Sequence, residues 1–258
     1  TMSMKIIIKT PQQIQSLRDG GKYHNELLLL VYHAAKPGVS LLDLEKIASD
    51  YLISHKLRSA FKGFHNYPAN ICLSVNDCIV HGIPDAKILK NGDFLKIDIG
   101  IQYQGMITDA AVCKIIWWYQ HNKAGAELMR TTKEALDKSL ELVKNWSSLM
   151  EYGRRVGNFV ESKGCSIIKS LTGHGVGKGM HEDPRIPNYA DPRLKGIKFK
   201  TGMVIALEPI TAEISQDYTV HKNKRDLITT HGDLGCQWEY TVLVTETGYE
   251  ILAGITNL

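Results

Sequence analysis

The sequence predicts an α+β protein built from two similar halves, in each of which two helices precede strands of an antiparallel sheet. Helix-start signals and apolar periodicity mark one pair of helices before residue 55 and a second pair between residues 128 and 162. Segments of strand composition follow each pair, and no linker rich in Pro, Gly or Ser separates the halves. We therefore expect one domain over residues 1–258, with halves at about residues 10–120 and 121–252.

A long helix should open the first half. Thr10 suits the N-cap, Pro11 suits the first helical position, and Gln13 can close a capping box. The helix should run to about residue 36, where a Pro-Gly pair follows.

A second helix is predicted to begin at Ser40, with Asp43 closing its capping box. Apolar residues then recur at helical spacing, at Leu41, Leu44, Ile47, Ala48, Tyr51 and Leu52. The strand-like segments that follow cover residues 71–75, 92–102 and 106–118.

The second half repeats this order without a recognisable repeat of residues. A third helix is expected over residues 128–143, and a fourth over residues 149–162 ends at Gly164 as a C′ glycine. Strands are expected at residues 166–171, 203–208 and 238–244.

Composition limits the partners. The net charge is +4 with Lys/Arg and Asp/Glu interspersed, which does not indicate a specific nucleic-acid partner. The longest apolar run, residues 27–32, is far shorter than the ~20 residues of a membrane span. No secretory signal is evident, and five cysteines without a C-x-x-C motif are typical of a reduced protein. We expect a cytoplasmic protein without a membrane partner.

Two aspartates share a predicted hairpin. Apolar side chains alternate over residues 95–101, so that Asp98 lies on the other face, and a turn near Gln104-Gly105 returns the chain through Asp109. If the loop has an even number of residues, residue 98 pairs with 109 or 111, and both aspartates project from one face. Such carboxylates repel unless they share a proton or a cation. A pair of solvated aspartates remains the alternative.

Further polar residues occupy positions where burial would be costly. His174 lies in a glycine-rich segment and His181 follows it, while Glu208 ends one apolar strand and Glu239 lies within another. An oxygen-rich set with one imidazole suits Mn, Fe or Co at an open site, in contrast to a closed structural zinc site. Carboxylates able to bridge indicate two metals about 3.5 Å apart, an arrangement that generates a hydroxide nucleophile.

The chain resembles the type I methionine aminopeptidases of the short, bacterial kind, from about residue 10 to residue 252. The shared motifs, in that family's order, are His81-Gly82-Ile83-Pro84, Asp98, Asp109, Gly173-His174-Gly175, His181-Glu182, Glu208-Pro209 and Gln237-x-Glu239. The resemblance implies a single catalytic domain with the pita-bread fold. It also implies a monomer that removes the initiator Met of nascent polypeptides, with the ribosome as a further partner, when the second residue is small.

The resemblance also implies two divalent ions, Co, Mn or Fe. Asp98 would bind one metal and His174 and Glu208 the other, while Asp109 and Glu239 would bridge them.

The family's catalytic and substrate-binding positions can be carried over in the same way. Glu208 would act as general base, His181 would stabilise the oxyanion, and His81 would contact the leaving nitrogen. The substrate-binding residues would be these two histidines together with Phe61, Phe64, His65, Tyr67, Cys72, Met180 and Tyr218. Ordinary core packing is the alternative for the apolar ones.

Several positions depart from the family's pattern. Ala110-Ala111 follows Asp109 where hydroxyl residues are usual, so Ala110→Thr should tighten metal binding unless a water or Tyr240 already supplies the hydrogen bond. Phe61 replaces a smaller residue, which implies a shallower pocket. The basic stretch at residues 221–233 is longer than usual, and we expect it to be a solvated loop.

The sequence leaves two other functions open. A prolidase or Xaa-Pro aminopeptidase would share the fold and the five ligands, but it normally has an arginine close before the last glutamate. A non-catalytic pita-bread module that binds protein or RNA would be expected to lose ligands, and this chain keeps all five.

Overall fold

The first two helices begin at the predicted capping residues in the computed structural model, which describes residues 4–258. Helix α1 (Pro11–Ala34) starts with a capping box, in which the Gln13 amide donates to Thr10 Oγ at 3.2 Å and the Thr10 amide donates to Gln13 Oε1 at 3.0 Å. Ser40 and Asp43 form the same reciprocal pair at the start of α2 (Leu41–Ser54). Both starts confirm the predictions from sequence.

A long hairpin forms the centre of the first half. Strands β4 (Phe94–Tyr103) and β5 (Met106–Ile115) pair through a two-residue turn, so that Asp98 lies opposite Ala111 and Asp109 lies opposite Gly100. Because these two pairs are two residues apart, both aspartates point to the same face of the hairpin, as predicted. The remaining strands of this half are β1 (Arg58–Ser59), β2 (Ile71–Val75) and β3 (Cys78–Val80).

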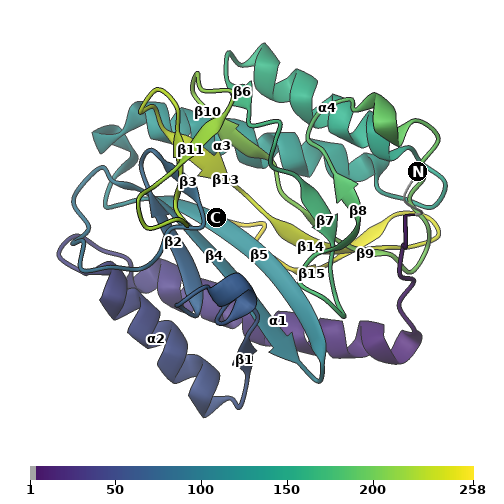
Figure 1. Ribbon diagram of the computed structural model, residues 1–258, viewed down its shortest axis with the longest axis horizontal. Coiled ribbons are helices and arrows are strands. Elements are labelled where there is room, and N and C mark those ends of the chain that lie inside the picture. The colour runs from purple at the N-terminus through teal and green to yellow at the C-terminus, as the bar shows by residue number, and fades with distance from the viewer. Residues whose placement is uncertain (1–3) are drawn as a thin grey trace.

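Helices α3 (Lys123–Ser139) and α4 (Leu149–Ser162) follow, and Gly164 ends α4 with φ of 77°. In Figure 1 they run along the edge of the molecule opposite α1 and α2, with the strands between the two pairs. The strands of this half are β6 (Ser166–Ile167), β7 (Gly173–Gly175), β8 (Glu182–Ile186), β9 (Val204–Leu207), β10 (Ile210–Ala212), β11 (Tyr218–Val220), β12 (Leu227–Thr229), β13 (Gly235–Gln237), β14 (Tyr240–Val244) and β15 (Tyr249–Ala253).

One predicted strand is largely wrong. The segment 166–171 is extended only at Ser166–Ile167, because the Leu171 amide donates back to the Ile168 carbonyl at 3.1 Å and closes a turn. The predicted strands at 106–118 and 238–244 are also shorter in the structure, as the bounds of β5 and β14 show.

The named strands pair antiparallel as predicted, but they form four sheets in place of one. The largest has the order β15-β14-β9-β7-β8, and a second contains β1, β4, β2 and β5. The two sheets meet where the backbones of Ala111 and Glu239 pair. The main core likewise contains buried residues of both halves, including Leu28, Ile97, Leu136 and Val242.

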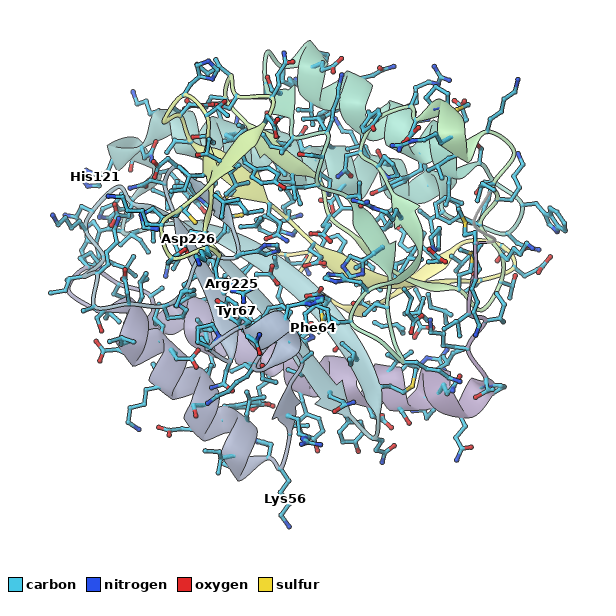
Figure 2. The ribbon with its side chains drawn as sticks, viewed as in Figure 1. Lys56, Phe64, Tyr67, His121, Arg225 and Asp226 are labelled. Atoms are coloured by element: carbon cyan, nitrogen blue, oxygen red, sulfur yellow. The ribbon has the colours of Figure 1, made fainter. Side chains whose placement is uncertain are left out.

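The stretch 221–233 differs most from its prediction as a solvated loop. Residues 227–229 form β12, which pairs with β11 on one side and with β3 on the other. The side chain of Leu227 is buried against Val80 and Ile79 in a small apolar cluster, and this burial stabilises the pairing of the segment with β3. Arg225 and Asp226, just before β12, lie beside the segment that carries Tyr67 (Figure 2).

The helices contain no candidate for a membrane span. Within residues 4–258, none combines sufficient length with the apolar character that crossing a bilayer requires.

Candidate active site

A cavity of about 650 Å³ lies over the face of the β4–β5 hairpin that carries Asp98 and Asp109. It brings together twelve of the residues singled out from sequence, namely Phe61, Phe64, His65, Tyr67, Cys72, His81, Asp98, Asp109, His174, Met180, His181 and Glu208. Glu239 lies next to two of these residues. One possible ligand atom from each of Asp109, His174 and Glu239 lies within 4.8 Å of the other two.

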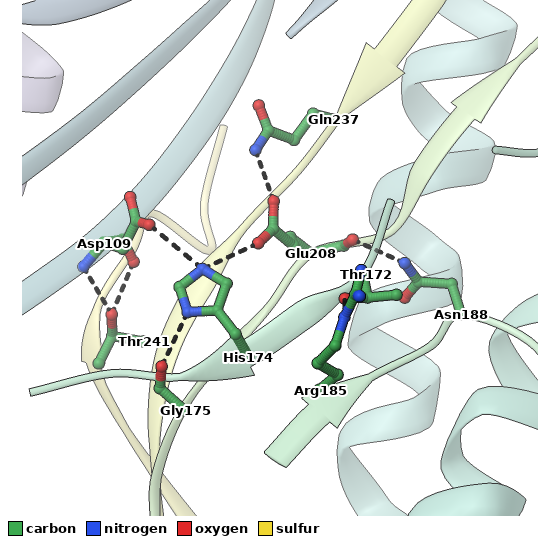
Figure 3. A network of polar contacts seen from close by, with 9 residues as sticks. All are labelled: Asp109, Thr172, His174, Gly175, Arg185, Asn188, Glu208, Gln237 and Thr241. Atoms are coloured by element: carbon green, nitrogen blue, oxygen red, sulfur yellow. Dashed lines mark hydrogen bonds and ion pairs between the residues drawn. The ribbon is translucent and has the colours of Figure 1, made fainter. Parts of the chain in front are cut away.

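His174 lies between two carboxylates (Figure 3). Its Nε2 is 3.6 Å from Asp109 Oδ2 and 3.2 Å from Glu208 Oε1, and its Nδ1 donates to the Gly175 carbonyl at 2.8 Å. The bond at Nδ1 fixes the ring so that Nε2 faces the carboxylates. This orientation is the one that a metal-binding imidazole requires.

The glycines on either side of His174 are needed for close strand packing. A Cβ at Gly173 would lie 2.4 Å from the Ala206 carbonyl oxygen, and a Cβ at Gly175 would lie 2.3 Å from the Asp183 carbonyl oxygen. No side chain fits at either position, because both obstacles are backbone atoms. The glycines therefore let β7 lie tightly between β8 and β9 and hold His174 in place.

Glu208 is held from two sides. Gln237 Nε2 donates to its Oε2 at 2.8 Å, and Asn188 Nδ2 donates to its main-chain carbonyl at 2.9 Å (Figure 3). Gln237 belongs to the last sequence motif, but the motif does not indicate this role, and nothing in the local sequence distinguishes Asn188.

Four buried carboxylate oxygens have no hydrogen-bond partner among residues 4–258. They are Asp98 Oδ1, Asp109 Oδ1 and both oxygens of Glu239. An isolated buried carboxylate without partners is strongly disfavoured. Oxygens left unpaired beside an imidazole are the donor set expected for a divalent metal, so the site fits such an ion.

The pKa directions agree with this interpretation. Burial, together with the neighbouring carboxylates, raises the pKa of Asp98 and of Glu239 well above the usual range. Burial also raises the pKa of Asp109. Burial lowers the pKa of His174, but its hydrogen bonds to Asp109 and Glu208 outweigh burial and raise it to about 10. Without a cation the cluster therefore retains protons, and a bound cation would displace them.

Two further histidines open onto the cavity. The ring of His181 packs edge-on against His174, with centroids 4.4 Å apart, and contacts Phe64 at 5.3 Å. Desolvation by the surrounding protein and the charge of His174 lower the pKa of His181 to about 4, so it is neutral at pH 7. Desolvation also lowers the pKa of His81, with Glu208 acting in the opposite direction and Arg225 in the same one.

The apolar side of the cavity is a small packed cluster. Phe61, Tyr67, Cys72 and Met180 belong to it and are buried, so they both line the cavity and pack as core. Cys72 pairs in register with Asp98, which places the thiol beside the carboxylates. The Tyr67 hydroxyl lies 2.9 Å from the Gly82 carbonyl and 3.0 Å from the Ile71 carbonyl, and this ties the cluster to the segment around His81.

Tyr218 does not belong to the cavity wall that the described residues form. It lies on β11 and packs against the cluster of Ile79, Val80 and Leu227. Its contact with substrate stays a prediction.

The geometry contradicts the premise of the expectation for Ala110. Ala110 pairs with Ile99 and packs in the main core, on the face of the hairpin opposite to Asp98 and Asp109. A hydroxyl at residue 110 would therefore point away from the carboxylate that it was meant to support. Tyr240 does not supply that bond either, since its hydroxyl donates to Asp137 Oδ1 at 2.8 Å.

The chain is similar in sequence and in fold to known metallopeptidases. The sequence pattern of metallopeptidase family M24 matches residues 15–246. A methionine aminopeptidase of Escherichia coli is 36% identical over 251 residues, which cover 96% of this chain and 94% of the relative. The crystal structure of a methionine aminopeptidase from Thermotoga maritima superposes with a TM-score of 0.93 at 35% identity, over 97% of this chain and 100% of that one.

A prolidase from Pyrococcus furiosus is more distant. It has a TM-score of 0.75 at 21% identity and covers 98% of this chain and 66% of that one, a likeness of fold alone. The pita-bread fold implied by the resemblance is confirmed. The match over nearly the whole length, together with the converging carboxylates and histidine, shows that the chain belongs to metallopeptidase family M24.

Proposed function

We propose that this chain is a two-metal methionine aminopeptidase that removes the initiator Met from nascent polypeptides when the second residue is small. The observation that carries the proposal is the set of unpartnered, buried carboxylate oxygens around His174, next to an apolar cavity. Relatives of this length and identity are methionine aminopeptidases, which supports the same conclusion.

The metal-binding residues follow from the resemblance together with the geometry. Asp98 would hold one ion and His174 and Glu208 the other, with Asp109 and Glu239 shared between them. Two such ions, Co, Mn or Fe, would polarise the peptide carbonyl and lower the pKa of a water.

The chain's own groups supply the proton transfers. Glu208 would accept a proton from the attacking water, and its bond from Gln237 Nε2 fixes the carboxylate for that role. Neutral His181 would donate a hydrogen bond to the carbonyl oxygen as negative charge develops there. His81, which also lines the cavity, would contact the leaving nitrogen.

The apolar cluster would hold the methionine side chain. Tyr67, Cys72 and Met180 present aromatic carbon and sulfur, which suit a flexible thioether. Phe61 packs tightly onto Gly100, since a Cβ there would lie 2.5 Å from the Phe61 ring. This fixed ring would limit the depth of the pocket.

We further propose that both halves act as one catalytic domain, since the five ligands come from both. The substrate would be the nascent chain as it leaves the ribosome, and the enzyme would act there as a cytoplasmic monomer. Its five cysteines are free thiols, which fits a reducing compartment.

The test compares four peptides after chelation and reloading with one metal at a time. We expect turnover of Met-Ala-Ser, little turnover of acetyl-Met-Ala-Ser or Met-Leu-Ser, and none of Ala-Pro-Ser. Asp109→Asn and Glu239→Gln should each abolish activity because they remove a bridging carboxylate, whereas Asp19→Asn on the surface of α1 should not.

Two outcomes would contradict the assignment. Fastest turnover of Ala-Pro-Ser would favour an Xaa-Pro aminopeptidase. Full activity of either bridging variant, or of the metal-free protein with chelator present, would refute the metal site.

A further inference from the structure

The segment between β11 and β12, residues 221–226, forms a short ordered arm. The side chain of Asn223 accepts from the amides of Arg225 and Asp226, at 3.0 Å each. The His221 amide donates to the Asp226 carbonyl at 2.9 Å and closes the arm at its base. The arm therefore holds Arg225 and Asp226 in a defined position.

The arm contacts two separate segments of the cavity wall. Arg225 Nη2 donates to the carbonyl of His65, and Asp226 Oδ1 accepts from the amide of Ile83 at 2.9 Å. Figure 2 shows Arg225 with Asp226 on one side and Tyr67 and Phe64 on the other. One short arm thus connects the segment before β2 to the segment after β3.

Both contacted segments have unfavourable backbone conformations. His65 and Asn66 have φ of 45° and 61°, and His81, two residues before Ile83, has φ of 62°. Non-glycine residues persist in this left-handed region when surrounding contacts hold them there. The arm supplies such contacts at both places.

The guanidinium of Arg225 has hydrogen-bond donors beyond the one that contacts His65. It lines the cavity, and one of its five N–H groups is used by His65. Among residues 4–258 no carboxylate forms an ion pair with it, although the cavity contains several acidic side chains. Among these residues its guanidinium is therefore not engaged by a carboxylate.

The position of Arg225 relative to His81 indicates which part of a peptide it would meet. Leu227, two residues after Arg225, pairs with Val80, which directly precedes His81. In the proposed function His81 contacts the leaving nitrogen, whereas the apolar cluster holds the methionine. With His81 in that role, Arg225 would lie beside the part of the peptide that follows the scissile bond.

We propose that Arg225 forms a carboxylate-binding subsite for the part of the substrate that follows the scissile bond, an inference that rests on the proposed function. A guanidinium offers two parallel N–H groups that match a carboxylate. That carboxylate can be the terminal group of a tripeptide or the side chain of an acidic third residue, and the two sources share one chemistry.

The test measures KM and kcat of the metal-loaded enzyme for Met-Ala-Ser, Met-Ala-Ser-amide and Met-Ala-Asp-amide. The wild type should have a KM about 10-fold lower for the free acid than for its amide, as expected for a charge-assisted pair. Met-Ala-Asp-amide should recover part of that difference if a side-chain carboxylate also binds. In Arg225→Gln the three KM values should converge with kcat nearly unchanged.

Matched controls separate this role from general charge and from loop positioning. Lys222→Gln and Lys224→Gln remove the same charge from exposed positions on the arm and should retain the preference for the acid. Arg225→Lys keeps the charge without the fork and should show an intermediate preference.

Three results would overturn the subsite. The first is equal KM values for acid and amide in the wild type. The second is a preference that survives in Arg225→Gln, and the third is an equal rise in KM for every peptide in that variant, which would show loop positioning only. If no Met peptide is cleaved with any metal, the proposed function fails and the subsite fails with it.

Discussion

His24 is a buried ionisable side chain that the proposed chemistry does not use. It is 0% exposed, its Nδ1 lies 2.7 Å from Thr108 Oγ1, and its Nε2 has no hydrogen-bond partner among residues 4–258. Burial lowers its pKa from 6.5 to about 3. In the folded protein His24 therefore stays neutral at pH values above about 3.

This residue should make the folded state sensitive to acid. The unfolded chain protonates His24 below pH 6.5 while the folded chain does not, so the free energy of unfolding falls as the pH drops from 6.5 towards 3. One proton corresponds to about 1.4 kcal/mol per pH unit. The difference in unfolding free energy between wild type and His24→Asn should thus fall by about 2 kcal/mol between pH 7.5 and pH 5.

Urea unfolding at each pH measures this difference. Asn is the matched replacement because its amide can take the place of Nδ1 towards Thr108. A difference that does not change with pH would mean that His24 carries a proton in the folded state.

Site residues could be predicted from sequence where a charged residue lies in an apolar strand, as for Glu208 and Glu239, because burial of an unpaired charge is costly. The orientation of individual side chains was harder. Ala110 and Ala111 look equivalent in sequence, but strand alternation places Ala111 opposite Asp98 and Ala110 in the core. Sequence position alone suggests Tyr218 as a substrate contact, whereas in the structure this side chain packs against the apolar cluster of Val80 and Leu227.

Helix α1 packs more closely on the sheet than its sequence indicates. Gly20 and Gly21 lie in the middle of the helix, where glycine is ordinarily less favourable than alanine by about 1 kcal/mol. A Cβ at Gly21 would lie 1.8 Å from the Leu252 carbonyl oxygen on β15, and one at Gly20 would lie 2.9 Å from Tyr103 Cβ. The glycines allow the helix backbone to meet the strand backbone directly.

Gly21→Ala should therefore destabilise the protein, against the usual preference of helices. Because the obstacle is a backbone oxygen, the helix or β15 must move, and we expect a loss of about 3 kcal/mol or more. Gly248→Ala is the matched control, since nothing lies within 4 Å of a Cβ there. Thermal unfolding of both variants measures the effect, and equal stabilities would show that α1 can shift without cost.

Elements with local signals were predicted well, and those formed by distant contacts were not. The capping boxes of α1 and α2 lie within four residues of sequence, as does the turn of the central hairpin. The arm at residues 221–226 has no apolar period and carries several charges, which is typical of a loop. Its structure depends on contacts with His65 and Ile83, far away in sequence.

At the scale of the whole molecule, the proposed metal site links both halves. Asp98 and Asp109 come from the first half, and His174, Glu208 and Glu239 from the second. Metal binding should therefore stabilise the complete fold, because an ion bound only by the folded state shifts the unfolding equilibrium.

We expect a metal-dependent melting temperature. At a Mn²⁺ concentration 100-fold above Kd the stabilisation is about 2.7 kcal/mol, which corresponds to roughly 5–10 °C for a chain of this size. Glu239→Gln should melt no lower than the wild type in chelator, since it removes a buried acid without partners, and it should gain little from Mn²⁺. Exposed Glu161→Gln should respond like the wild type. A full metal response in Glu239→Gln would contradict the shared role of that carboxylate.

The backbone pairing of Ala111 with Glu239 has a consequence for how the enzyme is made. These partners are 128 positions apart (111 to 239), and synthesis proceeds at about 5–20 residues per second. The hairpin that carries Asp98 and Asp109 thus leaves the ribosome roughly 6–26 s before its partner strand. During that interval the growing chain holds part of a peptidase and cannot act on its own N-terminus or on a neighbouring nascent chain.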